Sequence, residues 1–332
     1  MDSPLRFVRR SGMTLLFIFF ITCLTLSFDQ KSSDAQPQAW KPQGRLTIIL
    51  SSYGGAFDLT ARQLGQVLPD YLGQSAIAQA VTGAEGANAL DFVQKSKPDG
   101  RTISLIGMGT YITLSVKKQY PWDVKDLPIV LAIDTPPYAV YASTKSPYLT
   151  YQDLVKVKRD VRIGIGGTNF SILPMLLDLE KKGIQYKVAR FKGSAEANLA
   201  VIAGDADLTI GALSGVNTDK IRSGDFRALY VLGTKRFPLI PNTPTHAELG
   251  MPKEWANYRL MRLMQVAPGT PEPIQKGLRE ALIKGLQDKR TLEWSVKVDT
   301  PVDIMTEEEC MERIRFVVEG FKSNPKIIDA YF

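Results

Sequence analysis

Three glycine-bearing loops are the segments of this sequence best suited to chemistry, because each follows a β-branched run and precedes a helical pattern. The loops span residues 51–58, 106–110 and 164–171. Glycine lets the backbone turn sharply and approach a ligand closely. The helix that follows presents unpaired N–H groups and the positive end of its dipole. Such loops can hold a carboxylate or phosphate without arginine or lysine. A tight turn explains any one loop more simply, but three together favour anion binding.

Two charged side chains near these loops have a functional and a simpler interpretation. We expect Asp58 to organise the first loop by accepting hydrogen bonds from its amides. Asp58 and Arg62 are four residues apart, so a solvated helix pair explains them equally well. Lys192, next to Gly193, could meet an acidic ligand, although solvation ordinarily explains one exposed lysine.

Several common chemistries lack the residues that they need. His246 is the only histidine, and no His/Cys cluster has the spacing of a zinc site. His246 stands in a proline-punctuated segment, where a surface or capping role is expected rather than catalysis by a triad. Gly164 and Gly166 begin a dinucleotide fingerprint, but Asn169 occupies its third glycine position, and no phosphate-loop motif occurs. The sequence therefore predicts no metal and no cofactor.

The charge balance also argues against nucleic acid as a partner. The formal net charge is +7, and basic residues are scattered along the chain. Nucleic-acid-binding proteins instead carry clustered, arginine-rich runs with interleaved aromatic residues. A mild basic excess is compatible with anionic solutes.

The first 35 residues have the order of a secretory signal peptide. A basic leader with Arg9 and Arg10 precedes a charge-free run over residues 13–28, and small residues follow up to Ala35. The run is shorter than the roughly 20 residues that span a bilayer. We expect export to the periplasm with cleavage after Ala35. A lipid anchor on Cys23 and a twin-arginine route are alternatives that the sequence leaves open.

The remaining chain alternates strand and helix patterns, which predicts an α/β fold with mostly parallel sheets covered on both faces. Removal of residues 1–35 leaves 297 residues, a length typical of two domains. Strands are expected at 46–50, 77–81, 102–106, 129–133, 138–142, 161–165, 187–190, 208–211 and 227–232. Helices are expected at 58–68 (ended by Pro69), 150–158, 170–182, 196–203, 272–288 and 306–322.

Seven short segments, in the same order, resemble the substrate-binding receptors of tripartite tricarboxylate transporters, also called TctC or Bug proteins. Each segment is weak alone, but their conserved order makes the resemblance specific. The segments are GGAFDLTAR at 54–62, GAEGAN at 83–88, KPDGRT at 97–102, FKGS at 191–194, GDAD at 204–207, PNTPTHAELG at 241–250 and APGTP at 267–271.

The resemblance implies a type II periplasmic-binding fold with two α/β domains and a ligand cleft between them. Residues 36–137 and 243–332 would form the first domain, and residues 138–242 the second. The carboxylate would be held by backbone amides, small polar side chains and ordered water. The implied ligand-binding residues are Tyr53, Gly54, Gly55, Phe57, Asp58, Gly107, Met108, Gly109, Thr110, Gly166, Gly167, Thr168, Asn169, Phe191, Lys192 and Gly193.

Three departures from the family pattern bear on the ligand. Phe191 replaces the tyrosine of a Tyr-Lys-Gly motif, which removes a hydroxyl. The segment after Gly167, where relatives often carry histidine, is bulkier here, and Phe57 replaces a small residue of the first loop. These changes favour an aromatic or apolar monocarboxylate over a ligand like citrate.

The sequence therefore predicts a non-enzymatic receptor that captures a small organic carboxylate by hinge closure. A membrane permease of the tripartite type is the expected partner, and the receptor is expected to be a monomer. A ligand sensor that presents its closed form to a signalling kinase is one alternative. A periplasmic enzyme that uses carboxylates such as Asp58, Asp205 or Asp207 is a second.

Overall fold

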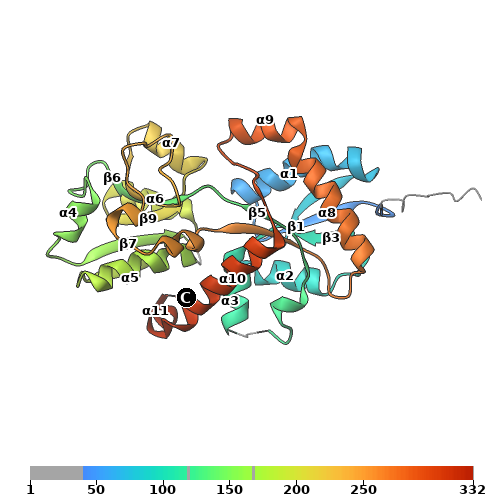
Figure 1. Ribbon diagram of the computed structural model, residues 1–332, viewed down its shortest axis with the longest axis horizontal. Coiled ribbons are helices and arrows are strands. Elements are labelled where there is room, and N and C mark those ends of the chain that lie inside the picture. The colour runs from blue at the N-terminus through green and yellow to red at the C-terminus, as the bar shows by residue number, and fades with distance from the viewer. Residues whose placement is uncertain (1–39, 118–119, 167–168, 332) are drawn as a thin grey trace, which may run out of the picture. The chain divides into compact units, whose positions relative to one another are not determined.

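Strands and helices alternate through most of the chain, as the sequence patterns predict (Figure 1). The computed structural model describes residues 40–117, 120–166 and 169–331. The strands are β1 Leu46–Leu50, β2 Ala76–Ala80, β3 Thr102–Ser104, β4 Ile106–Gly107, β5 Ile129–Asp134, β6 Tyr138–Ser143, β7 Val161–Gly166, β8 Tyr186–Phe191, β9 Leu208–Ala212, β10 Phe226–Leu232, β11 Met261–Gln265 and β12 Ile304–Met305. The helices are α1 Gly55–Leu72, α2 Ala87–Gln94, α3 Met108–Lys117, α4 Tyr151–Val155, α5 Leu173–Lys181, α6 Ser194–Ala203, α7 Val216–Arg222, α8 Glu272–Gln287, α9 Lys289–Lys297, α10 Glu307–Lys322 and α11 Pro325–Tyr331.

The first sheet is parallel and has the order β2-β1-β3. Ile48 at the centre of β1 pairs with Ala78 on one side and Ile103 on the other. Ile48 and Ile49 are both fully buried, in separate core clusters. Burial on both faces is the reason that this strand reads as a continuous apolar run.

A second sheet, β12-β5-β11-β4, is antiparallel and adjoins the first through a bridge between Ile103 and Val266. Its strand β11 was not predicted. The sequence Met261-Arg-Leu-Met-Gln265 lacks the β-branched residues that mark a strand. Pairing with β5 and β4 on its two sides imposes the extended backbone there.

The third sheet has the order β10-β6-β9-β7-β8 and is mixed. β9, β7 and β8 run parallel, while β10, β6 and β9 run antiparallel. Strands that alternate strictly with helices therefore pair in parallel. The strands that pair with β6 and β11 run antiparallel to them. The predicted α/β class with mixed sheets is confirmed.

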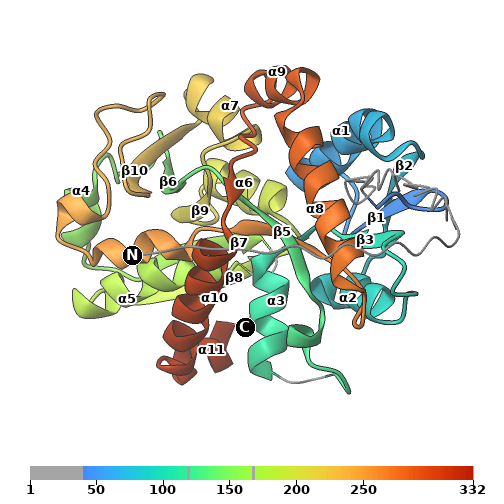
Figure 2. The same cartoon turned by 45° about the vertical axis from the view of Figure 1, so that its right-hand side comes forward.

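Helices cover both faces of the sheets. In Figure 1, α1 lies above β1 and β3, and α2 and α3 lie below them; α8 contacts α1 and β5. Figure 2 shows α10 running beside α3, which it contacts. In β6, Ala139 and Tyr141 pack in one core cluster, whereas Tyr138 and Val140 pack in another. This alternation is the two-residue period of a strand that is buried on both sides.

The passage from β5 to β6 and the return into β11 are tied together by one half-buried carboxylate, that of Asp134. Asp134 forms ion pairs with Arg259 at 2.5 Å and with Arg313 of α10 at 2.6 Å. Burial alone raises the pKa of Asp134, but the two guanidinium groups outweigh it and lower that pKa. Residues Ala39–Phe332 group as one compact unit, so the domain boundaries at 138 and 242 stay a prediction.

Helix α1 does not end at Pro69, as the sequence suggested; it continues to Leu72. A proline in the last turn removes only one helical hydrogen bond. Gly73 then closes the helix in the left-handed conformation, with its amide bonded to the carbonyl of Pro69. Burial of Leu72 and a 2.8 Å hydrogen bond from the Tyr71 hydroxyl to Asp288 hold the last turn in place.

No helix in the described part of the chain is long and apolar enough to cross a membrane. The run at 13–28, Cys23 and the cleavage site after Ala35 all lie outside the described residues. The predicted signal peptide therefore stays a prediction.

The expectation of a surface or capping role for His246 was wrong. This side chain is only 1% exposed, and it forms no cap hydrogen bond to the 3₁₀ turn Ala247–Leu249 that it precedes. Its two ring nitrogens lie 3.3 Å from the carbonyl oxygens of Val231 and Lys253. Burial lowers the pKa of His246. The ring is a neutral packing element that joins the segment after β10 to residues 252–254.

The burial of His246 predicts a pH-dependent stability. As the pH falls from 7 to 5, the unfolded chain binds a proton at this residue while the folded protein resists it, so the unfolding free energy decreases. The expected decrease is about 1–2 kcal/mol. Urea unfolding at several pH values measures it. His246→Gln should flatten the profile in this window, since the chain has no other histidine; an unchanged profile would contradict the assignment.

Candidate functional site

The loops after β1 and β2 meet the start of α3, which follows β3 and β4, at the carboxyl edge of the first sheet. A Cβ atom on Gly86 would lie 2.7 Å from the Thr110 hydroxyl oxygen and 3.2 Å from the Ser51 Cβ atom. Thr110 donates a 2.9 Å hydrogen bond to the carbonyl of Glu85. Parallel strands bring their carboxyl ends to one edge, which explains why segments from three parts of the sequence converge.

Asp58 organises the first loop in the way that the sequence predicted. Its carboxylate accepts a 3.1 Å hydrogen bond from the Gly54 amide and hydrogen bonds of 2.9 and 3.0 Å from Arg62 Nε. Burial raises the pKa of Asp58, but the bonds from Arg62 and Gly54 outweigh it and lower that pKa. The carboxylate therefore stays ionised and holds the turn that begins α1.

The loop after β2 is a part of this edge that we did not predict as a binding element. Four consecutive residues, from Gly83 to Gly86, have positive φ angles between 45° and 108°. Ala84 and Glu85 have side chains that make this conformation costly. Gly83 and Gly86, at the two ends of this stretch, are the residues from which the sequence could have indicated an unusual backbone here. A pocket of about 200 Å³ beside this loop is lined in part by Glu85, Thr110 and Tyr120.

A second set of loops follows β7 and β8. A Cβ atom on Gly166, the last residue of β7, would overlap the backbone of Gly193 and Ser194. Only glycine permits this approach of two main chains. Asn169 caps the short 3₁₀ turn that follows, accepting from the Ser171 amide at 3.2 Å and donating to the Ile210 carbonyl at 3.2 Å.

One ion pair joins the two sets of loops. Arg190, near the end of β8, contacts Glu85 of the loop after β2. These residues are 105 positions apart in the sequence, so no local pattern could have related them. The pair places Phe191, Lys192 and Gly193 close to the first set of loops.

The other predicted site residues differ in how they could contribute. Met108 is fully buried in the core, so a ligand could meet only its backbone. Phe57 and Phe191 are half-buried, whereas Tyr53 and Lys192 are exposed. The Lys192 amide donates to Glu196 at 3.1 Å. Gly167 and Thr168 lie outside the described residues.

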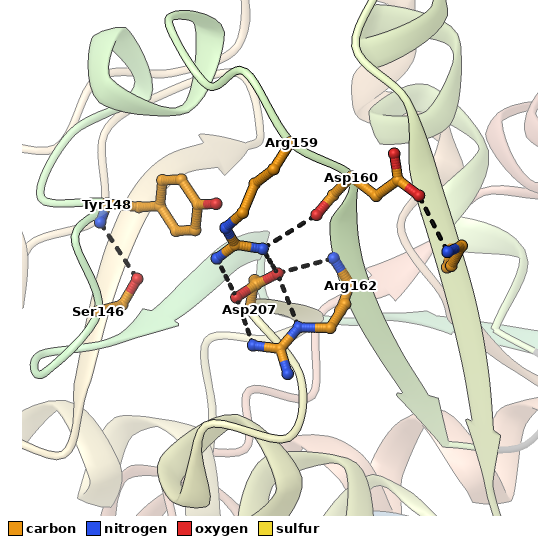
Figure 3. Close-up of polar contacts among 7 residues, drawn as sticks. Ser146, Tyr148, Arg159, Asp160, Arg162 and Asp207 are labelled. Carbon is orange, nitrogen blue, oxygen red and sulfur yellow. Dashed lines mark hydrogen bonds and ion pairs between the residues drawn. The ribbon is translucent and has the colours of Figure 1, made fainter.

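Asp207 is committed to the sheet rather than to this site. Figure 3 shows its carboxylate between Arg159 and Arg162, which donate hydrogen bonds of 2.8 to 3.2 Å. The Arg162 amide adds a bond of 2.8 Å. Burial raises the pKa of Asp207, but the two arginines outweigh it and hold that pKa well below its usual value. This contact lies at the opposite end of β7 from Gly166.

The structure offers no metal site in the residues that it describes, since no three His, Cys, Asp or Glu side chains there could share an ion. A larger cavity of about 710 Å³ lies between β5, α8 and α10. Apolar side chains such as Leu131 and Ile314 line much of it, and none of the predicted site residues does. The candidate site is therefore the meeting point of the two sets of loops.

Comparison with known families decides the class of protein that carries these loops. The model of the tripartite tricarboxylate transporter family receptor, TctC, matches residues 60–331. The chain belongs to this receptor family. The TctC receptors are solute-binding proteins, which agrees with the predicted absence of an enzymatic role at the level of the family.

Individual relatives agree with the TctC match. A UPF0065 protein of Agrobacterium vitis is 27% identical over 300 residues, which cover 88% of this chain and 84% of the relative. BugT of Bordetella pertussis is 29% identical over 259 residues, which cover 75% and 78%. The resemblance to TctC and Bug receptors that the sequence motifs indicated is confirmed.

Three solved structures, among them the periplasmic binding protein BugD, share the fold of this chain. BugD has a TM-score of 0.70 at 22% identity, covering 85% of this chain and 98% of BugD. A Rhodopseudomonas palustris protein with adipate has a TM-score of 0.72 at 23% identity, covering 86% and 97%. MatC from the same organism, with bound malate, has a TM-score of 0.69 at 21% identity, covering 85% and 98%. The predicted fold class is confirmed.

The approach of β7 to the loop after β8 predicts a difference between two neighbouring glycines. Gly166→Ala should lower the unfolding free energy by roughly 2 kcal/mol, because its Cβ atom meets backbone that cannot move aside. Gly193→Ala is the matched control. Gly193 has an extended backbone and open space around it, so its replacement should cost less than about 1 kcal/mol. Equal losses in urea unfolding would contradict this account.

The Asp207 contact predicts a loss of stability without a loss of binding. Asp207→Asn should cost about 2 kcal/mol, less than a fully buried pair, because both arginines are half-exposed. Asp205→Asn, at an exposed neighbour, should stay within about 0.5 kcal/mol. Thermal unfolding measures both. A folded Asp207→Asn protein with altered ligand affinity would show that Asp207 also serves the site.

Proposed function

We propose that this TctC receptor captures a small organic carboxylate in the periplasm and delivers it to a tripartite tricarboxylate-type permease. The convergence of the loops after β1, β2, β4, β7 and β8 at the Arg190–Glu85 contact supports this proposal. The malate and adipate bound by two structural neighbours support the carboxylate class. Export by a signal peptide cleaved after Ala35 is part of the same proposal.

In this proposal, backbone amides carry most of the binding. Helices α1, α3 and α6 all begin at the candidate loops, so the unpaired amides of their first turns face the same region. Hydrogen bonds from amides to a carboxylate are charge-assisted and strengthen when water is excluded. Gly54, Gly55 and Gly193 have no side chains that would obstruct the approach of an anion.

Capture of the ligand would follow from hinge closure, and release from hinge opening. The hinge would lie where the chain passes from β5 to β6 and where it returns into β11. A ligand that contacts both sets of loops stabilises their approach, and only that state would dock on the permease. Arg190–Glu85 and a second pair, Arg222–Asp299 at 2.6 Å, span segments that such closure would bring together. Both acids have positive φ angles, an uncommon backbone conformation for residues other than glycine.

The aromatic side chains at the loops support an apolar or aromatic monocarboxylate as ligand. Phe57 and Phe191 are half-buried, one beside Gly107 and the other beside Gly164. Aromatic rings add apolar contact area for the body of a ligand. A tricarboxylate would gain little from these rings and would need more polar partners.

A thermal-shift panel tests the proposed function. The protein, stripped of co-purified solutes, would be heated with malate, adipate, citrate, benzoate and hexanoate. A ligand that binds only the native state raises the melting temperature with its concentration; at 100 times Kd the stabilisation is about 2.7 kcal/mol. We expect the largest shift with benzoate or hexanoate. A response to citrate and malate alone would overturn the monocarboxylate preference, and no response would overturn carboxylate binding.

A further inference from the structure

Arg262 of β11 is a buried cation without a counterion. Its side chain is 2% exposed, and it forms no ion pair with any residue that the structure describes. Within the described part of the chain, its Nε atom has no hydrogen-bond partner, and the guanidinium forms a single long hydrogen bond of 3.4 Å to the Pro301 carbonyl. The charge of Asp134 raises the pKa of Arg262, but Asp134 is already paired with Arg259 and Arg313.

This side chain lies directly beneath the first candidate loop. Arg262 shares a face of β11 with Met264 and Val266, which belong to the core that α1 covers. Its guanidinium carbon is 5.6 Å from the centre of the Phe57 ring. Gly107, its pairing partner in β4, leaves the space into which that ring extends, 3.3 Å from where a Cβ atom would stand.

The guanidinium remains charged despite its burial. Burial lowers the pKa of Arg262 to about 10, which still leaves it protonated at neutral pH. Nearby, burial raises the pKa of Tyr138 and the charge of Arg262 opposes that increase. A buried charge with no partner is expensive, and an apolar side chain of the same volume would usually be better tolerated.

The groups around Arg262 make its buried positive charge still less favourable. The first turn of α1 begins at Gly55, so the positive end of the helix dipole lies on the same side as the guanidinium. Contact with the Phe57 ring offsets only part of this cost. An anion between the loop amides and Arg262 would satisfy both positive groups at once.

We propose that Arg262 is the fixed positive charge that receives one carboxylate group of the ligand, and that Phe57 covers it when no ligand is present. This inference rests on the proposed function and adds a specificity-determining side chain to a site otherwise built from backbone amides. A single guanidinium in an apolar setting matches one carboxylate on an apolar body. Its planar fork suits a bidentate carboxylate contact.

Ligand pairs that differ only in charge test this inference. Benzoate, hexanoate and adipate would each be compared with benzamide, hexanamide and adipamide by isothermal titration calorimetry. The wild-type protein should prefer the carboxylate over its amide by about 100-fold, and Arg262→Met should reduce that preference to less than about 5-fold. Arg262→Lys keeps the charge but loses the fork, so a preference of about 10-fold is expected.

Stability separates this role from a structural one. Arg262→Met should unfold at the same temperature as the wild type or higher in the absence of ligand, because it removes an unpaired buried charge. Arg279→Met is the matched control, since Arg279 is half-buried in α8 and its Nε donates to the Val130 carbonyl. The control should keep the wild-type preference for carboxylates.

Each outcome decides between the claims. Carboxylate binding by the wild type with an unchanged preference in Arg262→Met overturns the role of Arg262 and leaves the proposed function standing. If Arg262→Met does not fold, an unchanged preference in Arg262→Lys overturns it instead. If the wild type binds none of the three carboxylates, the proposed function fails and this inference fails with it.

Discussion

Parallel pairing of strands is the constraint on which the candidate site depends. Because β2, β1 and β3 run in one direction, the loops that follow them end at one edge, where Gly86, Ser51 and Thr110 meet. The parallel pair β7 and β8 brings Gly166 against Gly193 in the same way. Any ligand held by these loops is therefore positioned by strand direction before any side chain contributes.

Charged side chains that stabilise the fold have partners of opposite charge, whereas Arg262 at the candidate site does not have one among the described residues. Asp58 and Asp207 are buried and Asp134 is half-buried, and each is paired with at least one arginine that keeps it ionised. Asp58 holds the first loop, and Asp134 holds the two passages between the sheets. Asp207 holds the start of β7. Arg262 is the contrasting case, since it is buried beneath Phe57 and forms no ion pair with an acid among the residues that the structure describes. A receptor that closes around an anion can leave such a charge for its ligand to neutralise.

Much of the fold could be predicted because local patterns and tertiary structure agree there. The apolar run at β1 and the helical repeat of α1 both reflect faces that the core buries. Predictions failed where tertiary contacts override local preference. Helix α1 passes through Pro69 because its last turn is anchored from outside, and His246 is buried because the segment around it packs against β10. Strand β11 carries no strand pattern and exists through its two neighbours.

The sequence by itself determined the family and the glycine loops, and it placed Asp58 and Arg62 four residues apart beside the first loop. Those features depend on residues close together in the chain, or on the order of short motifs. Only the tertiary structure decided that Glu85 meets Arg190 and that Arg262 lies under Phe57. Those pairs join segments far apart in sequence, and an unpaired buried charge is defined by what is absent around it. No spacing in a chain can record that absence, because it depends on how every neighbouring element packs.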